Sequence, residues 1–230
     1  MKSTFIAAGV AVLMASGANA ANLDFLDFAN NNEHGVANGT VINFDGVDVT
    51  FDAGISSTGA EAFSYFDHGG AGLGVCKSPR DGVTFGGGLT GQGTGNDCFN
   101  AGDDNVTSDE YVTISFDGIF TLSELSFTGE GHSFSNPVFL QDEDPGRADA
   151  TLLFGINGGD LEQFTFADLA TLSFDDVFSA TFAFDDEYET ADQFYLASAV
   201  LAPIPLPAGL PMLLAGLGGF GFLARRRKNA

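Results

Sequence analysis

The fold of this chain is decided by Tyr111-Val112-Thr113-Ile114-Ser115-Phe116. Side chains of two kinds alternate along this stretch, and a period of two predicts a strand with one buried face. Asp117-Gly118 follows and predicts a turn, because Asp-Gly is a preferred hairpin dipeptide. A second alternating stretch, Ile119-Phe120-Thr121-Leu122, comes next. The segment therefore predicts two strands joined by a tight turn.

Stretches of the same kind lie on both sides of this segment. Residues 41–44 and 47–51 flank Asp45-Gly46, and this arrangement predicts a β-hairpin. Further strands are predicted at 125–127, 151–156, 164–166, 177–184 and 194–200, with a helical turn over 166–170 as the alternative where the strand at 164–166 ends. Short strands separated by glycine and aspartate turns predict an all-β fold, an antiparallel β-sandwich.

The N-terminus predicts a secretory signal peptide over residues 1–20. Lys2 supplies a positive start, residues 5–14 form a short apolar core, and Ala18-Asn19-Ala20 is a small-residue cleavage site. The alternative is an N-terminal membrane helix, which the short apolar core disfavours. Residues 21–202 are then predicted to be one exported domain, since their number suits a single core.

The C-terminus predicts one transmembrane helix. A charge-free apolar run covers residues 206–224, and as a helix it would be roughly 28 Å long, enough for the hydrocarbon core of a bilayer. Four basic residues end the run and are expected to stay in the cytoplasm: Arg225, Arg226, Arg227 and Lys228. This topology leaves the predicted domain on the far side of the membrane.

A short motif stands before the apolar run, formed by Pro205, Leu206, Pro207 and Ala208. Motif, span and basic cluster together resemble the PEP-CTERM class of sorting signals, in the variant whose motif reads V-P-L-P-A. Here Ile204 replaces the valine. The resemblance implies that residues 203–230 are a sorting signal and that the precursor is anchored in the inner membrane. It also implies that an exosortase-type membrane protease cuts near the motif and releases the protein to the cell surface or extracellular matrix. A plain single-span anchor is the alternative.

Looser resemblances to exported domains of this class occur at 72–76, 103–106, 109–117 and 191–196. They imply that the β-sandwich is jelly-roll-like. They imply no specific activity for it.

The predicted domain is strongly acidic. All 31 aspartates and glutamates of the chain lie in residues 21–202, against three basic residues there, Lys77, Arg80 and Arg147, so the net charge is −28. Such a surface excludes nucleic-acid binding, which needs lysine and arginine to neutralise phosphates. Solubility in a salty medium and binding of cations both explain the charge.

One acidic cluster predicts a calcium site. Within eight residues it offers five oxygen-bearing side chains, those of Asp103, Asp104, Asn105, Asp109 and Glu110. Calcium takes six to eight oxygen ligands, and loops beside strands supply them in many proteins. The alternative is a solvated acidic loop without a metal.

Cys76 and Cys98 are the two cysteines of the chain. Both belong to the predicted exported part, where an oxidising compartment favours a disulfide. The sequence predicts this bond, which would close a glycine-rich loop.

Motifs for catalysis are absent from the sequence. The three histidines form no H-x-H or H-E-x-x-H pair, and no G-x-S-x-G elbow occurs. Asp67 and His68 are adjacent, but neighbours on a strand face opposite sides, so a turn is the favoured setting. We therefore expect a structural or interaction role at the cell surface or in the matrix, and no enzyme.

A calcium-dependent carbohydrate-binding module is the alternative function, with exopolysaccharide as partner. It rests on fold analogy, since tryptophan is absent and tyrosines are few. A secreted hydrolase is the third reading, because paired carboxylates for glycoside hydrolysis remain open in so acidic a chain.

Overall fold

The computed structural model of the chain describes residues 19–31, 33–77, 98, 104–129, 150–187 and 191–204. Nearly all of the predicted signal peptide, the whole sorting motif and the predicted transmembrane helix lie outside these ranges. Within them, neither helix has the length and hydrophobicity that a membrane crossing needs.

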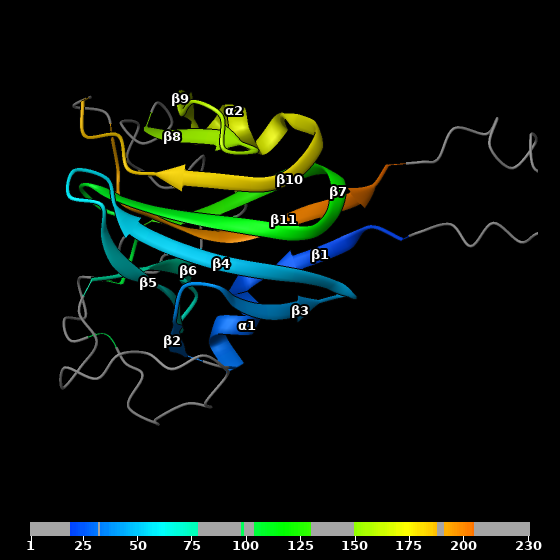
Figure 1. The fold of residues 1–230 in the computed structure, drawn as a ribbon, viewed down its shortest axis with the longest axis horizontal. Helices are drawn as coiled ribbons and strands as arrows, with labels where there is room; N and C mark the ends of the chain where they lie inside the picture. The colour runs from blue at the N-terminus through cyan, green and yellow to red at the C-terminus, as the bar shows by residue number, and fades with distance from the viewer. Residues whose placement is uncertain are drawn as a thin grey trace, which may run out of the picture.

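Strands dominate the described residues, which confirms the all-β class (Figure 1). Two short helices interrupt the strands. In chain order the elements are β1 (Ala21–Asp24), α1 (Phe25–Asn31), β2 (His34–Val36), β3 (Thr40–Phe44), β4 (Val47–Ile55), β5 (Ala60–Asp67), β6 (Gly72–Cys76), β7 (Glu110–Gly129), β8 (Thr151–Ile156), β9 (Glu162–Thr165), α2 (Phe166–Thr171), β10 (Ser173–Ala183) and β11 (Phe194–Pro203).

These strands form one hydrogen-bonded sheet in the order β1-β11-β6-β5-β4-β7-β10-β8-β9, with β2 beside β5 and β3 beside β4. The paired strands are antiparallel, as expected. β11 also pairs with β7, so β11, β6, β5, β4 and β7 close a barrel-like circuit. Two separate sheets of a sandwich are therefore not confirmed.

The prediction of a turn at Asp117-Gly118 is wrong. β7 runs through both residues as one strand of 20 residues. Opposite β10, Val177 faces Phe120 while Ser179 faces Ser115, so extra residues of β7 bulge out at this point. A bulge bends a strand without ending it. Residues before it pair with β4 and residues after it pair with β11, which is how one long strand helps to close the circuit.

The predicted hairpin around Asp45-Gly46 is confirmed. β3 and β4 pair from Phe44↔Val47 outward. Asp45 and Gly46 have φ angles of 49° and 90°, the left-handed values that a tight two-residue hairpin turn requires.

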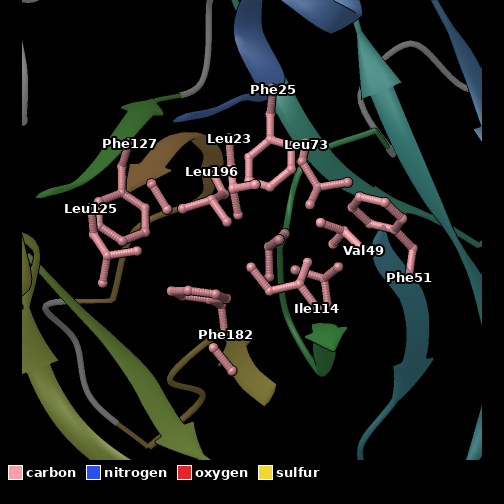
Figure 2. Packing of buried hydrophobic residues seen from close by; sticks show 14 of the residues in the cluster. Leu23, Phe25, Val49, Phe51, Leu73, Ile114, Leu125, Phe127, Phe182 and Leu196 are labelled. Atoms are coloured by element: carbon pink, nitrogen blue, oxygen red, sulfur yellow. The ribbon is translucent and has the colours of Figure 1, made fainter. Parts of the chain in front are cut away.

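The inner face of the sheet carries a core rich in phenylalanine. The alternation at 111–116 is confirmed, since Val112 and Ile114 are fully buried. Figure 2 shows side chains from the beginning of α1 and from β4, β7, β10 and β11 pointing into this common core. Several rings meet edge to face, among them Phe127 with Phe166 and with Phe194. Such contacts add to the stability that apolar burial provides.

Candidate functional site

The predicted calcium loop lies directly before β7, and Asp103 falls outside the described residues. Asp104 is buried, and its Oδ1 accepts a hydrogen bond of 2.7 Å from the hydroxyl of Tyr195. Asn105 is buried as well and donates from Nδ2 to Oε1 of Gln193 over 2.8 Å. Both side chains therefore bind β11 and the residue before it.

Asp109 has a φ angle of 71°, in the left-handed region that aspartate tolerates. Its Oδ1 accepts from the backbone N–H of Ser57 over 2.9 Å, and its Oδ2 accepts from the hydroxyl of the same serine. Its own N–H donates to Oδ2 of Asp186 over 2.7 Å. Asp109 thus joins two loops that are far apart in the sequence.

Glu110 is fully buried and has protein partners on both oxygens. Oε2 accepts from the N–H of Thr107 over 2.8 Å, and Oε1 lies 3.1 Å from Nζ of Lys77. A buried carboxylate is stable when it is paired in this way. In the described part of the chain, these acids do not bring three ligand atoms together. Calcium binding at this loop stays a prediction.

Cys76 and Cys98 form the predicted disulfide, which is confirmed. Their Cα atoms are 5.8 Å apart, and the bond links the end of β6 to a residue 22 positions later. Both cysteines are buried, and Tyr65 and Phe63 pack against them.

A second group of ionisable side chains lies at the end of β5. Within the described residues, Glu33, Asp67 and His68 are the group whose potential metal ligand atoms all fall within 4.8 Å of one another. Nδ1 of His68 is 2.8 Å from Oε2 of Glu33 and 3.8 Å from Oδ1 of Asp67. Asp67 is buried, Glu33 is partly buried and His68 is exposed. We call these three residues the His68 cluster.

Strand pairing explains how the His68 cluster forms. β2 pairs with β5 through His34↔Phe66, so one more step in the same register brings Glu33 beside Asp67. His68 has left the strand, as the sequence suggested, and begins the turn to β6. Side chains alternate between the two faces only within a strand. Because His68 lies outside β5, its imidazole can point to the same side as the carboxylate of Asp67.

The turn that carries His68 is fixed to α1. Gly69 and Gly70 have φ angles of 76° and 96°, which a glycine adopts without strain. The N–H of Gly70 donates to Oδ1 of Asn30 over 3.2 Å. The sequence alone missed Glu33, since its partners lie more than thirty residues away. The signal that could have found it is the pairing of β2 with β5.

Two buried tyrosines adjoin these carboxylates. Tyr65 donates to Oε1 of Glu33 over 3.2 Å. Burial raises the pKa of Tyr65 well above its usual value, and the negative charges of Glu33 and Asp67 raise it further. The pKa of Tyr195 is also raised, by burial first and then by Asp104 and Asp67. The tyrosines therefore remain neutral hydrogen-bond donors beside a concentration of negative charge.

A third feature is an open pocket of about 370 Å³ between β1, α1 and the β3–β4 hairpin. Amide, carboxylate and phenylalanine side chains line it. The lining residues are Asn22, Asp24, Asp27, Phe28, Asn31, Asn43, Phe44 and Asp45. The pocket therefore presents both polar groups and aromatic surface. We call it the Asn/Asp pocket.

Comparisons with protein-family models, with curated proteins and with solved structures gave no significant match. The function therefore has to be argued from the residues of this chain.

Proposed function

We propose that this protein is exported and sorted to the cell surface or extracellular matrix through the signal at residues 203–230, where it has a structural or interaction role. An exosortase-type membrane protease is its processing partner, and the inner membrane anchors the precursor. No catalytic step is assigned to it.

The observation that carries the proposal is the position of the last strand. β11 ends at Pro203, and only Ile204 separates it from the motif that starts at Pro205. A protease that cuts at this motif would remove the tail without cutting a strand of the sheet. The disulfide supports export as well, since such bonds persist in oxidising compartments.

Apolar residues at the same end support a position close to the membrane. Ile119, Phe178 and Ile204 are 58%, 48% and 38% exposed. Phe120 pairs with Val177 on one side and with Pro203 on the other, so these three residues lie side by side across the sheet. Ile119, Phe178 and Ile204 are their immediate neighbours in the sequence. Figure 1 shows the chain entering β1 and leaving β11 at one end of the molecule. A domain held by a C-terminal span would turn this end to the bilayer.

Mass spectrometry of the mature protein from its native cells tests the proposal, because it determines both termini at once. We expect a start at Ala21 and an end near residues 205–208. Replacing the four motif residues by Gly-Ser-Gly-Ser should leave the protein in the membrane fraction. Release of this variant at the wild-type rate would refute sorting through the motif.

We also propose that the closed sheet is a distorted form of the expected jelly-roll-like sandwich. In support, β7 has β4 and β5 on one side and β10 and β8 on the other. Both sets place apolar side chains in the same core. A crystal structure of the exported domain tests this arrangement.

A calcium-dependent carbohydrate-binding module is the second candidate, and the Asn/Asp pocket favours it. Amide groups of Asn31 and Asn43, carboxylates of Asp24 and Asp27 and the ring of Phe28 line the same pocket. The two amides also donate to Asp27 and to Asp48, which fixes their positions. A glycan array run with and without calcium tests this candidate. Binding that disappears in Asn43→Ala supports it, and unchanged binding in that variant excludes the pocket.

A further inference from the structure

We propose that the His68 cluster binds a divalent transition-metal ion of the zinc type, through Nδ1 of His68 and one carboxylate oxygen each of Glu33 and Asp67. This inference does not depend on the proposed sorting, because it concerns side chains in the folded domain. It also differs from the predicted calcium loop in its residues and in its ligand chemistry.

The distances in the His68 cluster fit such an ion. Zinc binds nitrogen and oxygen ligands at about 2.0–2.2 Å, so tetrahedral ligand atoms lie about 3.3–3.6 Å apart. The two separations from Nδ1, 2.8 Å and 3.8 Å, lie on either side of that range. Small rotations of exposed His68 and partly buried Glu33 would therefore complete the arrangement.

The donor atoms decide which class of metal is favoured. An imidazole nitrogen with two carboxylate oxygens suits zinc, manganese, iron and similar ions. Calcium and magnesium prefer oxygen ligands throughout, and calcium needs six or more of them. The His68 cluster should therefore discriminate against calcium. Three protein ligands leave at least one position for water, and the exposure of His68 leaves that position accessible.

Groups around the cluster hold its ligands in place. Tyr65 donates to Oε1 of Glu33, while Oε2 of the same carboxylate faces His68. The hydrogen bond from Gly70 to Asn30 fixes the turn that carries the imidazole. Metal sites depend on such supporting contacts, because they orient the ligands before the ion arrives.

The concentration of negative charge around the cluster is also favourable for a cation. The Asp67 side chain is only 5% exposed, and burying a carboxylate is costly unless positive charge lies beside it. Glu33 raises the pKa of Tyr65 and Asp104 raises that of Tyr195, while Asp67 acts on both tyrosines. The three carboxylates therefore lie in one region of the protein. His68 lies beside both carboxylates and supplies one positive charge at most. A divalent ion supplies two.

Bound metal would connect the residue before β2 to the turn after β5. These segments are joined by the short pairing of β2 with β5, which has three residue pairs. A ligand that binds only the folded state stabilises it in proportion to RT ln(1 + [L]/Kd). Zinc should therefore raise the melting temperature at concentrations near its dissociation constant.

The test is titration of the full chain, purified in detergent and stripped of metal, with zinc sulfate in 0.5 M NaCl (about 4 Å Debye length) to screen the acidic surface. His68→Ala and Glu33→Gln each remove one ligand. Glu61→Gln is the matched control, because it removes one charge from an exposed position on the same strand, β5. We expect one zinc per chain in the wild type and control, and at least tenfold weaker binding in both ligand variants.

Cobalt(II) gives a second readout that does not depend on thermal stability. Its visible absorption is much stronger at low coordination number than in six-coordinate complexes, and this intensity should be lost in His68→Ala. Calcium at the same concentration should not compete. Equal zinc affinity in His68→Ala and the wild type would show adventitious binding to surface carboxylates and overturn the proposal. Absence of stoichiometric zinc binding in the wild type would overturn it as well.

Discussion

Phe120 of β7 pairs with Pro203, the last residue of β11. β7, which helps to close the sheet, is therefore paired with the residue at which β11 ends and after which the apolar C-terminal segment begins. β11 ends two residues before the proposed motif at Pro205, so a membrane that held the proposed tail would lie near this end of the domain. Residues beside Phe120 should then lie close to lipid in the anchored precursor.

A single tryptophan tests this position, because the natural chain has none. In full-length precursor in bilayers, Ile119→Trp should have blue-shifted emission that brominated lipid quenches. Thr58→Trp is the control, since position 58 is also exposed but lies in the turn at the opposite end of β4 from the residues that pair near Ile119. Equal quenching at the two positions would mean that the end with Ile119 has no preferred contact with the membrane.

Reduction of the Cys76–Cys98 disulfide should destabilise the domain. The bond closes a loop of 22 residues, and the chain-entropy estimate for that length is roughly 3 kcal/mol. Denaturant unfolding with and without reductant should show a loss of this order. The double variant Cys76→Ala, Cys98→Ala should be insensitive to reductant. A wild-type midpoint that reductant leaves unchanged would contradict the estimate.

The fold class and several local features could be predicted because they depend on neighbouring residues. The strand at 111–116 follows from the alternation of six consecutive residues, and the hairpin turn at Asp45-Gly46 follows from one dipeptide. Asp117-Gly118 was misread because the same dipeptide suits a turn and a bulge. The choice between them depends on which strands pair with β7 on either side, and these come from distant parts of the chain.

The candidate site was only partly predictable for the same reason. Asp67 and His68 are adjacent in the sequence, so they could be noticed together, but Glu33 reaches them through the β2–β5 register. The predicted calcium ligands are adjacent as well, yet Asp104 and Glu110 turn to different partners, Tyr195 and Lys77. Proximity in sequence indicates a shared site only when the backbone directs the side chains to one point.

Alkaline pH should unfold the domain through its buried tyrosines. Tyr65 and Tyr195 have pKa values raised by burial and by neighbouring carboxylates, whereas an unfolded tyrosine ionises near pH 10. Below about pH 10 both states keep the proton, and the stabilisation is fully present. Above it the unfolded state releases protons first, so the free energy of unfolding falls as pH rises.

Unfolding midpoints between pH 8 and pH 11 measure this effect. Tyr195→Phe should reduce the slope of stability against pH above pH 10, because one of the two groups is then missing. It should also lower stability at pH 8, since Asp104 loses a hydrogen bond of 2.7 Å. A slope that is the same in wild type and variant would show that Tyr195 does not contribute to the alkaline transition.

Gly74 on β6 is predicted to be intolerant of any side chain, because a Cβ atom there would overlap the backbone of Asp104 and Asn105. Gly54 on β4 is the matched comparison, since a Cβ at that position meets the side chain of Tyr111. A half-buried side chain can rotate away, whereas backbone bonded to β11 cannot move without breaking the Asp104–Tyr195 and Asn105–Gln193 hydrogen bonds. Gly74→Ala should therefore cost about 2–3 kcal/mol of unfolding free energy, clearly more than Gly54→Ala. Denaturant unfolding of both variants measures the difference, and equal losses would mean that the loop before β7 shifts as easily as a tyrosine ring.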